Sequence, residues 1–331
     1  MTRIGIVVIG RNEGDRLRRC LDSVLGHGRR VVYVDSGSTD GSLALARQKG
    51  VLAVELDLSI PFSAARARNA GYQQLIAVDP SLEFVQFIDG DCELVEGWID
   101  RALQVADHDP KVAAIDGRRR ERFPEKSPYN RLCNMEWDRP AGEIRYCGGD
   151  VLIRCAAFQQ VGGYNPALIA GEEPELCVRL RLGGWKIIRV AAEMTVHDAA
   201  MTRFRQWFRR AIRAGHAFAE GAFMHGRPPE KHWVRESRSV WNWAFWVPVL
   251  SIGLAAPTHG WSLLLLGSYL YLAWRIWTHC QSRKQTSSET RLFVLFTILG
   301  KFPQLIGQLQ FWGHRLVGTR CPLIEYKESV R

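Results

Sequence analysis

The sequence has 331 residues, of which 47% are hydrophobic, so it is long enough for one large domain or two ordinary ones and too apolar to be disordered. Its formal net charge of +10 favours an anionic partner: nucleic acid, a phosphate-bearing substrate or the surface of an acidic membrane. The eight cysteines form no CxxC pair and have no regular spacing, which argues against a zinc site and a disulfide framework and favours a reducing, cytoplasmic compartment.

The first hundred residues alternate between short apolar runs and helical patterns. The run at 4–9 is too short for a signal peptide and predicts a first, buried strand. This βαβα order predicts an α/β fold with a mostly parallel, doubly wound sheet and helices on both faces. Ligands of such sheets bind beyond the carboxyl ends of the strands. The expected strands are 4–9, 30–34 and 84–88, and the expected helices are 17–25, 42–46 and 64–76.

Two acids separated by one glycine end the third of these strands, in the stretch FVQFIDGD. Residues two apart in a strand point to the same face, so Asp89 and Asp91 are expected to project together, with a positive group between them. Asp and Gly are also ordinary turn residues, so a plain strand-end turn is the alternative. Asp35, Asn12 and Glu13 follow the neighbouring strands, which favours a rim that binds a divalent cation and phosphate. Arg66 and Arg68 would serve the same phosphates.

The composition changes after about residue 200. The runs 240–256 and 261–274 carry no charge, approach the ~20 residues that span a bilayer, and are rich in Trp and Tyr. They predict a membrane hairpin with both ends cytoplasmic, because Arg235, Arg238 and Arg283 flank it on one side only. Two core helices of a soluble domain are the alternative.

Two further segments carry a membrane signal. The run 292–312 is interrupted by Lys301 and three glutamines, so we interpret it as a re-entrant or interfacial helix, with a full span as the alternative. Upstream, Phe204, Trp207 and their apolar neighbours share a helix with five arginines, which is typical of a helix on an anionic membrane or of a solvated basic face.

Seven stretches follow one another along the chain: IVVIGRNEG, VDSGSTDGS, ARARNAG, FIDGD, GGDVLIRCAAFQQVGGYNP, GEEPELCVRLRLGGWKI and VH. In this order they resemble the family 2 inverting glycosyltransferases with the GT-A fold, over roughly residues 3 to 200. The resemblance implies a nucleotide-diphosphate sugar as donor and a divalent metal, Mn²⁺ or Mg²⁺.

The resemblance also implies roles for single residues. Asp35 resembles the residue that reads the nucleotide base, Asp89 the one that contacts ribose or base, and Asp91 the metal ligand. Asn12, Glu13 and Arg68 resemble the shell around the nucleotide, and His197 a histidine that joins the metal or the diphosphate; a structural histidine is the alternative for His197.

The catalytic base of the family is the second acid of a Glu-Asp-x-x-Leu motif. Here the motif is Glu172-Glu173-Pro174-Glu175-Leu176, so the resemblance implies Glu173 as the base, with Glu172 beside it. A helix N-terminus should stabilise the anion of Glu173 and lower its strength as a base, and both acids could simply complement the helix dipole.

These observations predict four segments: a catalytic domain at 1–200, a basic amphipathic interface helix and linker at 201–239, a transmembrane hairpin at 240–278, and a cytoplasmic loop with a re-entrant, interfacial or third membrane helix and tail at 279–331. The expected function is metal-dependent transfer of one sugar to a lipid-linked or cell-surface glycan acceptor, at the inner membrane with the catalytic domain cytoplasmic, and without a nucleic-acid partner. The alternatives are a non-catalytic nucleotide-binding subunit of a polysaccharide synthesis complex and a processive synthase. The polymerases of the family carry Gln-x-x-Arg-Trp, where this chain has Arg210 in place of the tryptophan.

Overall fold

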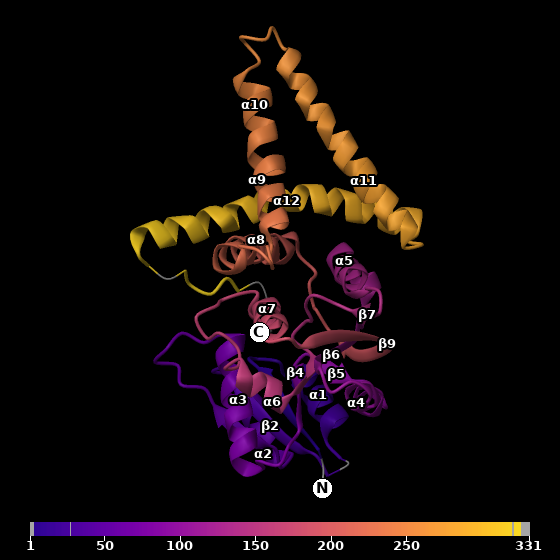
Figure 1. Cartoon of the computed structure of the whole chain (residues 1–331), viewed down its shortest axis with the longest axis vertical. Coiled ribbons are helices and arrows are strands. Elements are labelled where there is room, and N and C mark those ends of the chain that lie inside the picture. The colour runs from indigo at the N-terminus through magenta and orange to yellow at the C-terminus, as the bar shows by residue number, and fades with distance from the viewer. Residues whose placement is uncertain (1–2, 27, 320, 326–331) are drawn as a thin grey trace. The chain divides into compact units, whose positions relative to one another are not determined.

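The computed structural model describes residues 3–26, 28–319 and 321–325, and within them the chain divides into two compact units (Figure 1). The first unit consists of the residues up to Pro124 together with Cys133–Ala200. The second unit consists of Glu125–Leu132 together with the described residues between 201 and 325.

The first unit is built on one sheet with the strand order β3-β2-β1-β4-β8-β6-β9-β5, in which β7 also pairs with β9. Strands β3, β2, β1 and β4 are parallel, whereas β8 runs antiparallel to both β4 and β6. The predicted α/β fold class is confirmed, and the mixed half of the sheet comes, apart from β5, from residues beyond the first hundred. The strands are β1 Ile4–Gly10, β2 Arg30–Asp35, β3 Leu52–Glu55, β4 Phe84–Asp89, β5 Cys92–Leu94, β6 Val112–Glu121, β7 Gly142–Glu143, β8 Val151–Arg154 and β9 Lys186–His197.

Helices cover both faces of this sheet because its central strands are apolar on both sides. Val7 and Ile9 of β1 pack toward α3 on one face, and Ile6 and Val8 pack toward α1 on the other. Helices α3, α6 and α7 contribute to the first core, and α1 and α4 contribute to the second. The helices of this unit are α1 Asp15–Val24, α2 Ser42–Gln48, α3 Ala64–Val78, α4 Trp98–His108, α6 Cys155–Gln160 and α7 Glu172–Leu182. Helix α5, Pro128–Trp137, begins in the second unit and ends in the first.

The second unit is helical. Helices α9 (Val234–Trp241) and α10 (Val247–Gly253) are joined through a π-helical turn, Asn242–Trp246, and form one arm of a hairpin. A 3-10 segment, Trp261–Gly267, continues into α11 (Ser268–Ser282) as the other arm. Helix α8 (Phe204–His225) packs against α12 (Ser287–Val317).

Glycines set the close approach of α8 and α12. A Cβ on Gly215 would collide with the backbone of Gln304, and a Cβ on Gly307 would collide with the backbone of Ile212. The two helices therefore touch backbone to backbone, as small-residue crossings allow.

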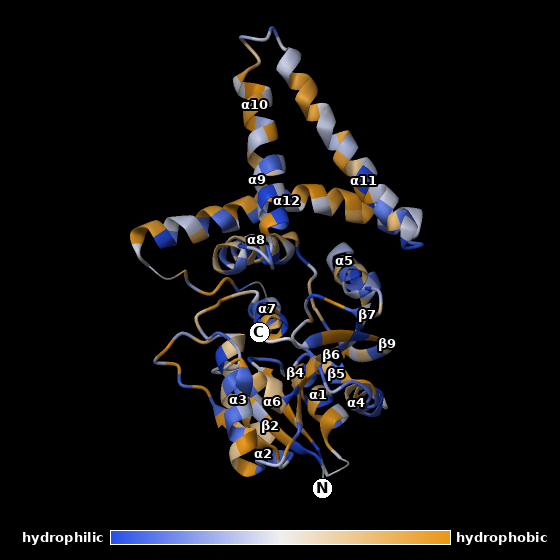
Figure 2. Cartoon of the chain, in the orientation of Figure 1, coloured by the Kyte–Doolittle hydropathy of each residue, from blue (hydrophilic) through white to orange (hydrophobic). Residues whose placement is uncertain are grey.

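Large apolar side chains are exposed along the hairpin and along α12, which Figure 2 shows as hydrophobic. Trp261 is 74% exposed and Leu270 is 76% exposed, values that exclude a buried core for these side chains. Among the described residues, α12 is the one helix long and apolar enough to cross a membrane by length and composition. Only 22% of the most apolar 18-residue stretch of this helix is buried, whereas a core helix of a soluble protein is mostly buried.

Candidate active site

The 89–91 turn lies at the carboxyl end of β4, beside the end of β1. The N–H of Gly90 donates to the carbonyl of Ile9 at 2.8 Å, and a Cβ on Gly90 would lie 3.1 Å from that same oxygen, so this tight turn favours glycine. Asp89 is the last residue of β4, and β5 begins directly after Asp91. The turn thus breaks the strand alternation between the two acids.

The two carboxylates contact different side chains, and the expected positive group between them stays a prediction. Asp89 contacts two arginines: Oδ1 lies 2.8 Å from Arg68 Nη2, and Oδ2 lies 3.6 Å from Arg119 Nη2. Asp91 instead lies 3.1 Å from Nε2 of His197.

Arg68 connects Asp89 to the start of α7. Its side chain is 3% exposed, and its Nη1 lies 2.9 Å from Glu173 Oε1 and 3.4 Å from Glu172 Oε1. Burial opposes the charge of this guanidinium, but the surrounding carboxylates, led by Asp89 and Glu173, outweigh it and raise the pKa of Arg68. One buried cation therefore holds three acids together.

Arg66 contacts the main chain before α3. Its guanidinium donates to the carbonyls of Asp57, Ile60 and Pro61, at distances of 2.7 to 2.9 Å. These contacts fix the loop that precedes α3, and a contact of Arg66 with phosphate stays a prediction.

Glu173 is a stronger base than its place at a helix start predicts. Burial, followed by the neighbouring Glu172, raises the pKa of Glu173 from 4.5 to about 7, although Arg68 opposes the rise. The expected lowering is therefore wrong, because burial of the carboxyl outweighs the helix dipole. A pKa near neutrality is what a general base needs.

Gly149 is the glycine that brings these groups close together. A Cβ there would collide with the guanidinium of Arg68 and would lie 3.0 Å from carboxylate oxygens of both Asp89 and Glu173. The backbone of Gly149 therefore packs directly against Arg68 and the two acids.

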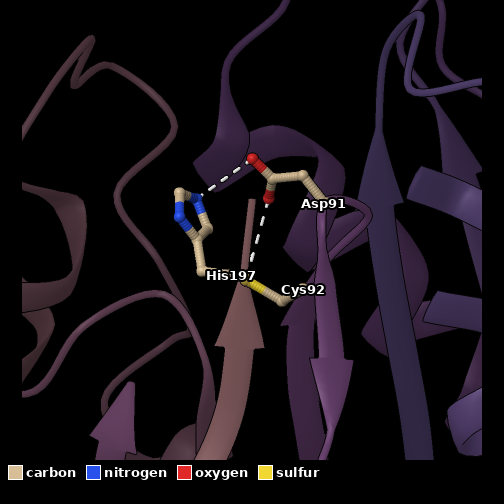
Figure 3. A group of neighbouring side chains, drawn as sticks. All are labelled: Asp91, Cys92 and His197. Atoms are coloured by element: carbon tan, nitrogen blue, oxygen red, sulfur yellow. Dashed lines mark hydrogen bonds and ion pairs between the residues drawn. The ribbon is translucent and has the colours of Figure 1, made fainter. Parts of the chain in front are cut away.

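Asp91, Cys92 and His197 form a buried cluster whose donor atoms all lie within 4.8 Å of one another (Figure 3). The Cys92 thiol donates to Asp91 Oδ1 at 3.7 Å, and burial raises its pKa, so it stays protonated and is a poor cation ligand. Burial lowers the pKa of His197, but the Asp91 carboxylate outweighs burial and raises it. A carboxylate and an imidazole at this spacing fit a Mn²⁺ or Mg²⁺ ion that takes further oxygens from a diphosphate.

A second cluster, Asp89, Cys92 and Asp150, also satisfies the spacing of metal ligands. Arg119 Nη2 lies 3.0 Å from Asp150 Oδ2, so the guanidinium of Arg119 already balances the negative charge of this cluster. The Asp91 cluster is the better candidate for the metal.

The remaining expected residues join the loops after β1 and β2. Asn12 Oδ1 accepts from the N–H of Thr39 at 2.7 Å, and the N–H of Asn12 donates to Ser38 Oγ at 2.9 Å. Asp35 is 4% exposed and accepts from the Tyr33 hydroxyl and from the N–H groups of Gly37 and Ser38. Its carboxylate therefore shapes the turn that follows β2.

Glu13 is buried and pairs with Arg16 at 2.9 Å. Its side chain lies against Gly10 and Gly90, where a Cβ would approach Glu13 Cγ at 3.3 and 3.4 Å respectively. It thus packs beside the turn that carries the acid pair.

Sequence reasoning gave Arg119, Glu121 and Asp150 no role in the nucleotide or metal site. Their signal was the charged run RRRE at the end of strand β6 and an acid directly after the glycine pair 148–149. Neither pattern says which distant side chain would be its partner.

Residues 5–159 match the family model described as glycosyl transferase family 2. The chain carries a family 2 glycosyltransferase domain. The solved mannosyltransferase PcManGT of Pyrobaculum calidifontis, in complex with GDP-Man and Mn²⁺, superposes with a TM-score of 0.63 at 18% identity, covering 93% of this chain and 87% of that one. The predicted family and fold class are confirmed by these matches.

Curated relatives of this glycosyltransferase domain agree. The pre-mycofactocin glycosyltransferase of Mycobacterium tuberculosis is 26% identical over 67% of this chain and 48% of its own length. Glycosyltransferase AglE of Haloferax volcanii is 22% identical over 64% of this chain and 71% of its own length. The chain thus spans about half the length of the first of these relatives.

Proposed function

We propose that this chain is a metal-dependent inverting glycosyltransferase that moves one sugar from a nucleotide-diphosphate sugar to an acceptor hydroxyl. The observation that carries the proposal is the buried Arg68, which joins Asp89 at the end of β4 to Glu173 at the start of α7. This contact places an acid with a pKa of about 7 beside the acids expected to bind the donor.

Each candidate residue then has a role. Asn12, Glu13 and Asp35 bind the nucleoside through the loops after β1 and β2, and Asp89 contacts its ribose or base, with Arg68 holding that acid. Asp91 and His197 hold Mn²⁺ or Mg²⁺, which supplies positive charge to the departing diphosphate. Glu173 takes the proton of the acceptor hydroxyl, and Glu172 raises the basicity of Glu173 through its negative charge.

The second unit supports a membrane-bound enzyme. On α12 the exposed apolar residues Leu295, Leu299, Phe302, Ile306 and Leu309 recur every three or four positions, so they form one face of the helix. A separate face, with Gly300, Pro303 and Gly307, is buried. A helix with one packed face and one exposed apolar face fits a position in the membrane interface.

A helix in the membrane interface supports an acceptor that is attached to lipid. The donor is water-soluble, whereas a polyprenyl-phosphate-linked or cell-surface glycan would meet the enzyme at the inner membrane, with the catalytic domain on the cytoplasmic side.

Gln206 accepts from the N–H groups of Thr202 and Arg203 and so caps α8, which gives it a structural role in this chain. Arg210, which stands where the polymerases of the family carry tryptophan, supports single addition over a processive synthase.

The test is donor hydrolysis by purified, detergent-solubilised protein. A panel of uridine and guanosine diphosphate sugars is supplied with Mn²⁺ or Mg²⁺, and the released diphosphate is measured. We expect metal-dependent release with one donor, lost in Asp91→Asn and in Glu173→Gln but kept in Glu193→Gln, an exposed acid that pairs with Arg120. Donor binding without any turnover, even with added lipid acceptors, would instead support the non-catalytic subunit.

A further inference from the structure

We propose that strand β6 supplies two positioning residues, Arg119 and Glu121, and that each one fixes a different acid of the 89–91 turn. Arg119 orients Asp89 for the nucleotide, and Glu121 orients His197, and through it Asp91, for the metal. The inference rests on the proposed function, which assigns the nucleotide and the metal to these two acids.

The geometry of the sheet places the two residues together. Arg119 and Glu121 are two apart on β6, so their side chains share one face of the sheet. Their partners across the parallel pairing with β9 are Thr195 and His197, which lie on that same face. Arg118 and Arg120 alternate with them and pair with Asp138 and Glu193, which are well exposed.

Arg119 is held beside Asp89 by Asp150. Asp150 is fully buried, and its Oδ2 lies 3.0 Å from Arg119 Nη2 and accepts from the Thr195 hydroxyl at 2.7 Å. Its Oδ1 accepts from the backbone N–H of Asp89 at 2.9 Å. Asp150 therefore fixes both the main chain of Asp89 and the guanidinium that faces the Asp89 carboxylate.

With Arg68 on Oδ1 and Arg119 beside Oδ2, the Asp89 carboxylate has a cation on each side. This arrangement restrains its rotation, which an acid that contacts a ribose or base needs. It also neutralises the repulsion between Asp89 and Asp150, whose acceptor atoms lie within 4.8 Å of each other.

Glu121 acts on the other acid. It is 1% exposed, and its Oε2 lies 3.4 Å from Nδ1 of His197 and accepts from the N–H of Ala199 at 3.1 Å. Its Oε1 accepts from the N–H of Phe123 at 3.3 Å. A carboxylate anchored this way can accept a hydrogen bond from the Nδ1–H of His197, and Nε2 then faces Asp91, the arrangement that supports a metal-binding histidine.

Trp137 packs against both Arg119 and His197. Its ring lies edge-on to His197, with centroids 4.8 Å apart, and its centroid is 5.4 Å from Arg119 Cζ. The aromatic ring limits the movement of both side chains and keeps them on separate acids.

The experiment separates the two roles by binding rather than by turnover. Glu121→Gln and Arg119→Lys are prepared in the full-length protein, with Glu193→Gln and Arg120→Lys as matched controls from the solvent-exposed pair. Mn²⁺ affinity is measured by electron paramagnetic resonance without nucleotide. GDP and UDP affinities are measured by calorimetry with Mn²⁺ at saturation.

Glu121→Gln should weaken Mn²⁺ binding about 10- to 100-fold, the usual loss when the carboxylate behind a ligand histidine is removed. Arg119→Lys should leave Mn²⁺ affinity within about twofold of the parent but weaken the preferred nucleotide about tenfold or more, because one ammonium cannot serve both Asp89 and Asp150. The controls should change neither affinity. If Arg119→Lys does not fold, Arg119→Met with Asp150→Asn removes both buried charges and tests the same prediction.

Equal losses of both affinities in both variants, or no loss beyond that of the controls, would overturn the inference. These outcomes are distinct from a failure of the proposed function, because a wild-type chain that binds Mn²⁺ and nucleotide without transferring sugar still reports both affinities. A wild-type chain that binds neither would overturn the proposed function and this inference together.

Discussion

Replacing Glu173 by glutamine should stabilise the protein at neutral pH while removing transfer. The pKa of Glu173 in the folded state is raised from 4.5 to about 7, mainly by burial and by Glu172. The folded state therefore favours the neutral carboxyl, whereas the unfolded chain ionises it from about pH 4.5 upward. Glutamine has the shape of that neutral form at every pH.

The size of the effect follows from the pKa difference. A rise from 4.5 to about 7 corresponds to a cost of about 3 kcal/mol for the ionised side chain in the folded state. Below pH 4.5 both states are protonated and the cost is absent; between pH 4.5 and 7 it grows, and above pH 7 it is complete. Arg68 loses one charged partner in the variant, which offsets part of the gain and leaves about 1 to 3 kcal/mol.

Thermal unfolding in detergent at several pH values measures this difference. For a domain of this size, about 1 to 3 kcal/mol corresponds to a rise in Tm of about 3 to 10 °C at pH 8, and the rise should vanish near pH 4.5. Transfer by the wild type should increase as the pH passes about 7, since the base must be ionised. A variant that is less stable than wild type at pH 8, or whose Tm difference does not change with pH, would refute the reasoning.

Asp91→Asn should reduce Mn²⁺ binding in electron paramagnetic resonance at least about 100-fold with unchanged circular dichroism, because a neutral amide replaces the charged oxygen ligand; unchanged Mn²⁺ affinity would place the metal elsewhere. Gly149→Ala should lower kcat about 10- to 100-fold, because its Cβ would collide with Arg68 and displace it from Asp89 and Glu173, and an unchanged kcat would contradict that contact. Gly307→Leu should lower the Tm of the second unit, at a cost of roughly 1 to 3 kcal/mol or more, because its side chain would enter the backbone of α8; a Tm equal to that of wild type would show that the helices do not pack this closely.

The sequence by itself determined the order of strands and helices in the first hundred residues and the rim on which their polar ends gather. Apolar periodicity is a local property, and it predicted β1, β2 and β4 nearly to their ends. The strand Leu52–Glu55 was missed, because four residues at a half-exposed edge carry too little alternation to stand out. The ordered family stretches supplied the candidate acids and the base.

Only the tertiary structure decided how those residues are used. Asp89 and Asp91 look equivalent in the sequence, yet the turn between β4 and β5 sends one to the arginines and the other to His197. Glu173 looked like a weakened base at a helix start, yet burial beside Glu172 makes it a stronger one. Arg119, Glu121 and Asp150 meet the site from segments separated by tens of residues. Burial and pairing between distant segments follow from the packing of the whole sheet, and no local pattern in the sequence records them.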